Sequence, residues 1–281
     1  MFRKGEIMVN EPYSVLMTVY KKDNPEYFRQ SLFSMLNQTI TPNEVVVIAD
    51  GPITNELQVV IDELDREYPN IINEIKLKEN VGLGTALKIG VLECKNEFIA
   101  RMDSDDISFP DRCRLQLKAF SDNPYLDIVG YSIKEFSGSI DNIVGERKVP
   151  ETNEAIYKFA KLRDPFNHPT VMFRKSKVIS SGNYGNYRKN QDSDLWIKML
   201  SHHAICMNLP YDQFRFRFDE ATYARRKNWL NTGSLLEIRY QAWQSGYNSW
   251  WEFFIITAGQ LARFVLPMSF QRILYKFLKR R

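Results

Sequence analysis

Two hydrophobic patterns alternate along the first 130 or so residues of this 281-residue chain. Short β-rich runs predict strands over residues 14–20, 44–50, 71–78, 98–102 and 126–131. Helical stretches separate these runs, over residues 25–38, 54–68, 83–93 and 110–120. Because strand and helix alternate, the pattern predicts an α/β fold built on a doubly wound, mostly parallel sheet.

The run at residues 45–49 is continuously apolar, which indicates a strand that is covered on both faces. Beyond residue 135 the pattern becomes less regular. It still predicts a strand over residues 169–173 and a helix over residues 193–201. Residues 227–281 look helical and rich in aromatic side chains, so we expect a helical segment after the α/β part.

A cluster of carboxylates follows the strand predicted at residues 98–102: Asp103, Asp105 and Asp106 lie within four residues. The carboxyl end of a strand is where open α/β sheets bind their ligands. Clustered negative charge there calls for a cation, and oxygen ligands of this kind suit Mg²⁺ or Mn²⁺ together with substrate phosphates. The cluster therefore predicts a metal–diphosphate site. The alternative is a solvated acidic turn that caps the next helix.

Composition excludes several other classes of protein. The net charge of +4 is too modest for a nucleic-acid binder, so we expect no nucleic-acid partner. The three cysteines are odd in number and widely spaced, and fit neither a disulfide framework nor a zinc site. They favour a reducing compartment, and the amino terminus lacks the apolar core of a signal peptide. We therefore expect a cytoplasmic protein.

Seven stretches of the chain, taken in order, resemble the inverting GT-A nucleotide-sugar glycosyltransferases of family 2. They are residues 14–20, 34–39, 47–52, 80–90, 101–112, 167–174 and 191–196. The resemblance implies a GT-A catalytic domain over residues 1–226. Its nucleotide-sugar half would span about residues 12–130 and its acceptor half about residues 131–226, with the helical segment 227–281 following.

The resemblance also implies roles for individual residues at the ends of the predicted strands. Thr18 and Tyr20 would line the base pocket, with Tyr20 stacking on a uracil. Asp50 would accept a hydrogen bond from the uracil N3–H. Asp103 would bind the ribose, and Asp105 would ligate the Mg²⁺ or Mn²⁺ ion that bridges the diphosphate.

Further roles are implied in the second half of the chain. Asp192 stands where the family keeps its general base, although the preceding residue is Gln191 where the family usually has Glu. Asp194 is expected to cap the helix that follows. His168 would face the diphosphate or the acceptor, or else be structural. Arg226 would reach the diphosphate, or else belong to a solvated basic turn.

These features together predict an inverting glycosyltransferase. It would move a sugar from a UDP-sugar to a hydroxyl of a glycan or lipid-linked acceptor, in bacterial capsule, exopolysaccharide or O-antigen synthesis. One alternative is a sugar-nucleotide nucleotidylyltransferase, which would share the sheet and the acidic metal site. That class normally has a glycine-rich basic loop after the first strand, where residues 21–25 contain no glycine. The other alternative is a non-catalytic protein that binds nucleotide-sugars.

The last ten residues place five cations among apolar and aromatic side chains. A basic amphipathic helix of this kind is typical of a segment that lies on an anionic membrane surface. We therefore predict a peripheral location on the inner face of the cell membrane. The alternative is a helix that packs against the catalytic domain or against a partner in a homodimer.

Overall fold

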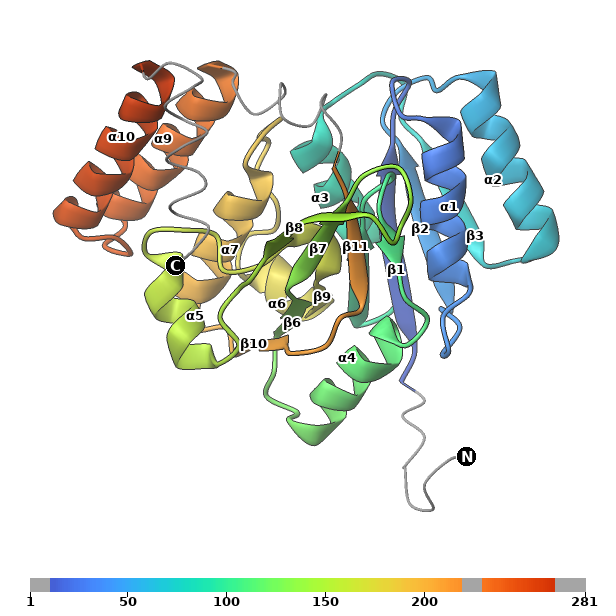
Figure 1. The fold of residues 1–281 in the computed structure, drawn as a ribbon, viewed down its shortest axis with the longest axis horizontal. Coiled ribbons are helices and arrows are strands. Elements are labelled where there is room, and N and C mark those ends of the chain that lie inside the picture. The colour runs from blue at the N-terminus through green and yellow to red at the C-terminus, as the bar shows by residue number, and fades with distance from the viewer. Residues whose placement is uncertain (1–10, 219–228, 266–281) are drawn as a thin grey trace. The chain divides into compact units, whose positions relative to one another are not determined.

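A computed structural model of the chain describes residues 11–218 and 229–265 (Figure 1). The chain divides into two compact units, Met1–Asp219 and Glu220–Arg281. The boundary predicted after residue 226 falls outside the described residues, as do Arg226 itself and the basic residues 272–281.

The first unit is built on a large sheet with the strand order β10-β6-β9-β4-β1-β2-β3. Its strands are β1 (Tyr13–Val19), β2 (Glu44–Ala49), β3 (Ile72–Lys76), β4 (Phe98–Met102), β6 (Ile128–Tyr131), β9 (Met172–Arg174) and β10 (Cys206–Leu209). Neighbouring strands are parallel except at β9, which runs antiparallel to both β4 and β6. The mostly parallel sheet predicted from the sequence is therefore confirmed.

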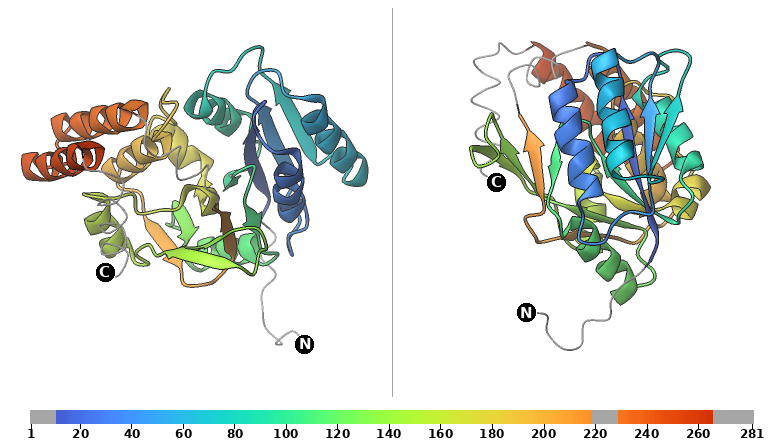
Figure 2. Two further views of the ribbon diagram at one scale, coloured as in Figure 1. Left: turned by 45° about the horizontal axis from the view of Figure 1, so that its top comes forward. Right: turned by 90° about the vertical axis from the view of Figure 1, so that its right-hand side faces the viewer.

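Helices cover both faces of this sheet (Figure 2). They are α1 (Pro25–Leu36), α2 (Asn55–Glu67), α3 (Leu83–Glu93), α4 (Arg112–Asp122), α5 (Asn153–Ala160), α6 (Lys175–Ser180) and α7 (Gln191–Ser201). Successive side chains of a strand point to opposite faces. Val15 and Met17 of β1 accordingly join the core that contains the apolar faces of α1, α2 and α4, whereas Leu16 lies against Gly90 of α3.

Local signals in the sequence account for where these helices begin. Asn24 caps α1 by accepting hydrogen bonds from two backbone N–H groups, and Pro25 occupies the first helical position. Thr54 caps α2 by accepting a hydrogen bond from the Leu57 N–H. The helices predicted at residues 25–38, 54–68, 83–93, 110–120 and 193–201 are all present, to within two residues at each end.

A second, smaller sheet was not predicted. Its order is β5-β11-β7-β8, with β5 (Ile107–Ser108), β7 (Ile133–Phe136), β8 (Ile143–Arg147) and β11 (Phe214–Arg217). The strand predicted over residues 169–173 is also wrong at its start, because His168–Thr170 forms a 3₁₀ turn and β9 begins at Met172. Pro169 favours the turn, since it has no N–H to give to a strand ladder.

The second unit contains α9 (Trp229–Gln244) and α10 (Trp250–Val265), so its predicted helical character is present in the described residues. A capping box starts α10: the Glu252 N–H donates to the Ser249 hydroxyl, and the Glu252 carboxylate accepts from the Ser249 N–H. Among the described residues, no helix combines the length and the apolar character that crossing a membrane requires.

Close backbone contact at Gly84 provides a test of this packing. The Gly84 N–H donates to the Tyr187 carbonyl at 3.1 Å, and a Cβ at residue 84 would collide with the backbone carbonyls of Gly185 and Tyr187. Gly84→Ala should therefore lower the free energy of unfolding by about 1–3 kcal/mol, the usual cost of overpacking, in urea unfolding followed by circular dichroism.

Gly233→Ala in α9 is the matched control, because a Cβ there meets nothing within 4 Å. It should stabilise its helix by about 0.5–1 kcal/mol through helix propensity alone. A Gly84→Ala protein as stable as the wild type would show that the contact between α3 and residues 185–187 is looser than described.

Candidate active site

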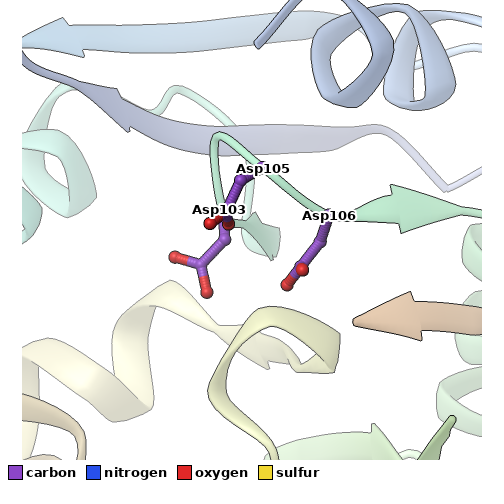
Figure 3. Close-up of side chains that lie close together, drawn as sticks. All are labelled: Asp103, Asp105 and Asp106. Atoms are coloured by element: carbon purple, nitrogen blue, oxygen red, sulfur yellow. The ribbon is translucent and has the colours of Figure 1, made fainter. Parts of the chain in front are cut away.

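The acidic residues predicted to bind metal lie on the loop that joins β4 of the large sheet to β5 of the small sheet. Asp103, Asp105 and Asp106 each bring one carboxylate oxygen into a cluster whose members lie within 4.8 Å of one another (Figure 3). The loop spans the two sheets, so both sheets fix its position. The structure thus brings together the three carboxylates that the sequence placed at a strand end.

Several neighbours hold this acidic loop in place. The guanidinium of Arg101, which is only 1 % exposed, forms an ion pair with Asp103. The Ser31 hydroxyl donates to the Asp103 carbonyl, and the Ser104 hydroxyl donates to the Asp23 carboxylate at 3.0 Å. The Arg217 N–H donates to Asp106 Oδ1 at 2.8 Å. Each residue of the loop therefore has a partner from a different part of the chain.

The environment of Asp106 fits a bound cation better than a solvated turn. Its side chain is fully buried, and among the described residues its Oδ2 has no hydrogen-bond partner. Burial, followed by repulsion from Asp105 and Asp103, raises the pKa of Asp106 well above its usual range. The cluster does not cap the next helix either, since α4 begins only at Arg112. An all-oxygen donor set with one unpaired buried oxygen is suited to Mg²⁺ or Mn²⁺.

Asp23 is a fourth carboxylate of this region, and the sequence analysis missed it. It accepts hydrogen bonds from the Tyr20 N–H at 3.1 Å and from the Ser104 hydroxyl at 3.0 Å. Burial, with added repulsion from Asp105 and Asp103, raises the pKa of Asp23 to about 7. Its position just after β1 was the available signal, because a strand end in such a sheet faces the ligand crevice.

The predicted nucleotide residues lie at the carboxyl ends of the neighbouring strands β1 and β2. Thr18 pairs in register with Ile48 of β2, and Asp50 follows directly after β2. Thr18 and Tyr20 are half-buried, whereas Asp50 is 7 % exposed. The register of the two strands thus places Thr18, Tyr20 and Asp50 at one edge of the sheet.

Asp50 has a structural role that was not predicted. Its Oδ1 accepts from the Val81 N–H at 2.7 Å, and its Oδ2 accepts from Asn80 Nδ2 at 2.9 Å and from the Gly82 N–H at 3.1 Å. Asp50 therefore anchors the loop before α3. An ionised carboxylate has about four acceptor sites, so one remains on Oδ1 for a ligand N–H.

Asp192 lies in the first turn of α7 and is half-buried. Burial, with added repulsion from the Asp164 carboxylate, raises the pKa of Asp192 to about 6. The buried Arg101 guanidinium opposes this rise, and it also opposes the rise at Asp106. One buried cation is thus within electrostatic range of both the acidic cluster and the predicted base.

His168 and Tyr184 form a buried pair beside this cation. Their side chains share a hydrogen bond of 2.8 Å between His168 Nε2 and the Tyr184 hydroxyl. Burial and then the charge of Arg101 lower the pKa of His168 well below its usual range, so the ring is neutral. Burial raises the pKa of Tyr184, and the carboxylates of Asp192 and Asp103 add to this rise. The pair therefore lies close to both acidic centres.

Asp194 does not cap α7 as predicted. The residue that precedes the helix is Asn190, and Asp194 is instead buried and accepts from the Gly185 N–H at 3.0 Å and from Lys198 Nζ at 2.7 Å. It ties the segment before α7 to the helix. Of the two acids in the first turn of α7, Asp192 is the one without such an ion pair to Lys198.

Comparison with known sequences identifies the family. A sequence model described as "Glycosyl transferase family 2" matches residues 14–181. The "UDP-Gal:alpha-D-GlcNAc-diphosphoundecaprenol beta-1,3-galactosyltransferase" of Escherichia coli is 35 % identical over 269 residues, covering 96 % of this chain and 97 % of that protein. The "Amylovoran biosynthesis glycosyltransferase AmsE" of Erwinia amylovora is 32 % identical over 269 residues, covering 94 % and 98 %.

Solved structures share the fold at low sequence identity. A mannosyltransferase from Pyrobaculum calidifontis in complex with GDP-Man and Mn²⁺ matches with a TM-score of 0.64 at 14 % identity, covering 95 % of this chain and 80 % of that one. S. aureus TarS 1–349 in complex with UDP-GlcNAc matches with a TM-score of 0.61 at 19 % identity, covering 95 % and 71 %.

These matches agree with the large mixed sheet and the acidic loop described above. The chain belongs to glycosyl transferase family 2, and it is a glycosyltransferase with a GT-A fold.

Proposed function

We propose that this glycosyltransferase moves a sugar from a UDP-sugar onto a hydroxyl of a glycan or lipid-linked acceptor, with inversion at the anomeric carbon and with Mg²⁺ or Mn²⁺ as cofactor. The observation that carries the proposal is the presence of two acidic centres around one buried cation, Arg101. The cluster of Asp103, Asp105 and Asp106 is suited to a divalent ion, and Asp192 has the raised pKa of a general base.

Asp105, with Asp103 and Asp106, would hold the metal ion, which when bound supplies positive charge to the leaving diphosphate. Asp192 would accept the proton of the acceptor hydroxyl. The hydroxyl oxygen then forms a bond to the anomeric carbon, the bond from that carbon to the diphosphate oxygen breaks, and UDP leaves. Attack from the side opposite the leaving group inverts the configuration.

The pKa of about 6 suits Asp192 to this role. At pH 7 the carboxylate is mostly ionised, yet it is a stronger base than an ordinary aspartate. A general base is most effective when its pKa lies near the working pH, because it then combines the correct protonation state with an adequate proton affinity. The neutral His168 and its partner Tyr184 would lie between Asp192 and the bound metal ion.

For the nucleotide we propose that Tyr20 and Thr18 line the base pocket and that Asp50 uses its remaining acceptor site for the uracil N3–H. Asp103 would bind the ribose, and Arg226 would contact the diphosphate. The name of the Escherichia coli relative contains UDP-Gal, and one structural neighbour holds UDP-GlcNAc. Both support a UDP-sugar over other donors, although another neighbour holds GDP-Man.

For the acceptor we propose a lipid-linked glycan in the synthesis of a bacterial surface polysaccharide. The name of the Escherichia coli relative includes a diphosphoundecaprenol-linked sugar, and other relatives are named for amylovoran and O-antigen biosynthesis. The family match sets aside the nucleotidylyltransferase alternative. Asp192 argues against a protein that only binds nucleotide-sugars, because binding alone needs no base.

We further propose that the second unit docks on the inner face of the cell membrane. Helix α10 exposes four large apolar side chains, each more than half exposed: Trp250, Trp251, Phe254 and Ile255. Tryptophan favours the headgroup region, where one end of its ring is apolar and the other is wet. The chain continues into a segment with five cations between residues 272 and 281, which complement anionic lipid.

The metal role is tested with Asp105→Asn. The wild type should bind UDP more tightly with Mn²⁺ than with EDTA, and the variant should lose this difference because one of three ligand carboxylates is gone. Isothermal titration calorimetry measures both affinities. Asp122→Asn is the control, since Asp122 is an exposed acid of α4 paired with Lys118. A variant that keeps the full Mn²⁺ effect would remove Asp105 from the metal site.

The role of Asp192 is tested with Asp192→Asn. Transfer should fall by about 10²–10⁴-fold, the usual contribution of a general base, while the affinity for the UDP-sugar changes little. The wild-type rate should fall as the pH drops through about 6, because protonation removes the base. That acid limb should be absent from the variant. Transfer at the wild-type rate, or an unchanged pH profile, would place the base elsewhere.

Membrane docking is tested by co-sedimentation with phosphatidylglycerol vesicles at low and high ionic strength. Removal of residues 267–281 should weaken binding at low salt, since each cation near such a surface contributes on the order of 1 kcal/mol. The double variant Trp250→Ser with Trp251→Ser should weaken binding at both salt concentrations. Tyr125→Ser is the control, because Tyr125 is an even more exposed aromatic residue of the first unit. Full-length protein that ignores the vesicles would leave α10 as a packing or dimer surface.

A further inference from the structure

Strand β11 lies directly beside the acidic loop. It pairs antiparallel with β5, with Phe214 opposite Ser108 and Arg215 opposite Ile107. Continued by two residues, this register places Arg217 opposite Asp105. Strand β11, the partner of the strand that follows the acidic loop, therefore brings a cationic residue alongside the carboxylates, although it is more than a hundred positions away in the sequence.

Arg217 forms hydrogen bonds to this loop through both its backbone and its side chain. Its backbone N–H donates to Asp106 Oδ1 at 2.8 Å, and its Nε donates to the Asp105 carbonyl at 2.8 Å. Its Nη2 donates to Gln30 Oε1 of α1 at 2.7 Å. The residue is 8 % exposed. Three bonds thus connect one arginine to two residues of the loop and to a helix of the large sheet.

Aromatic rings fix the plane of the Arg217 guanidinium. The centre of the group lies 3.9 Å from the centroid of the Tyr27 ring and 4.6 Å from that of Phe136. Phe136 also pairs with Arg217 in register between β7 and β11. A planar group packed between rings and held by a fork of N–H donors has little freedom to reorient. The carbonyl that it holds, that of Asp105, is correspondingly fixed.

We propose that Arg217 is a positioning residue for the metal site: it fixes the Asp105–Asp106 segment so that the carboxylates stay converged in spite of their mutual repulsion. The inference rests on the metal site of the proposed function. Arg217 would not touch the ion, since its side chain donates to the Asp105 carbonyl and to Gln30, and its backbone N–H donates to Asp106.

If Arg217 acts by fixing the position of the loop, its removal should weaken Mn²⁺ binding. If it acts only through its charge, its removal should strengthen Mn²⁺ binding. A cation near the cluster repels a divalent ion, so loss of its charge alone would tighten Mn²⁺ binding. Loss of the fork would instead let the carboxylates move apart, and partners that orient metal ligands typically contribute 10–100-fold in metal affinity. Lysine keeps the charge but cannot reproduce the planar fork or its stacking. Arg217→Lys therefore isolates the geometric contribution.

The experiment measures the affinity for Mn²⁺ alone, by electron paramagnetic resonance of the free ion, in the full-length protein. Arg217→Lys and Arg217→Met should both weaken binding, by about 10–100-fold. Arg215→Lys is the matched control on the same strand, because the Arg215 guanidinium pairs with Asp212 and stacks over Phe109 rather than reaching the acidic loop. It should bind Mn²⁺ like the wild type. UDP affinity in EDTA should be the same in all four proteins.

Gln30→Leu is a second route to the same answer if either Arg217 variant folds poorly. It removes only the hydrogen bond from Arg217 Nη2 to Gln30, which is half-buried on α1. Gln30→Leu should therefore weaken Mn²⁺ binding less than Arg217→Lys does. Wild-type Mn²⁺ affinity in Arg217→Lys, or in Gln30→Leu where Arg217→Lys is unfolded, would overturn the proposal. Tighter binding in Arg217→Met would favour charge over position and also overturn it. No Mn²⁺ binding by the wild type would overturn the metal site itself.

Discussion

Repulsion between carboxylates at one edge of the large sheet is the constraint around which the rest of the site is organised. Asp103, Asp105 and Asp106 converge within a few ångströms of one another, and Asp23 lies close enough for Asp103 and Asp105 to raise its pKa. Like charges at such distances, away from water, separate unless something holds them. The chain meets this constraint with a buried cation beside Asp103 and with hydrogen bonds between the acidic loop and three other segments.

Arg101 connects this constraint to the chemistry of the site. It occupies the face of β4 opposite the large apolar core, pairs with Asp103, and influences both Asp106 and Asp192. Two of its side-chain nitrogens, Nε and Nη1, have no hydrogen-bond partner among the described residues. A single buried guanidinium therefore lies within electrostatic range of both the acidic cluster and Asp192, the proposed base, so the two acidic centres are not electrostatically independent.

The strands and helices that follow a regular apolar pattern could be predicted from the sequence, whereas the elements that depend on tertiary contacts could not. The strands and helices of the large sheet follow from apolar patterns several residues long, such as the continuous run in β2, and their bounds agree closely with the structure. The small sheet was not predicted because its strands are only two to five residues long. In addition, β8 is largely exposed and its sequence has no alternation of apolar and polar residues. Pro169 begins a run that looked like one strand, but His168–Thr170 forms a turn and the strand starts only at Met172.

The same distinction applies to the site. Asp103, Asp105 and Asp106 were visible because they are adjacent in sequence, and the family resemblance supplied Asp50 and Asp192. Asp23 was signalled only by its position just after β1, and Arg217 carries no signal of its own, since it matters only through residues that folding brings near. Asp194 was assigned to a cap from its spacing alone, whereas its partners are an N–H nine residues earlier and a lysine one turn later.

The reversed direction of β9 has a consequence for how members of such a family can diversify. Met172 at its start pairs with Ala100, and Arg174 at its end pairs with Phe98, so β9 begins at the edge where β4 ends. The chain before β9, including His168, therefore lies at the edge of the sheet that carries the acidic loop, and the chain after β9 starts from the opposite edge. We therefore expect insertions just before β9 to change the surroundings of the acidic loop, and insertions just after it to extend the opposite edge of the sheet.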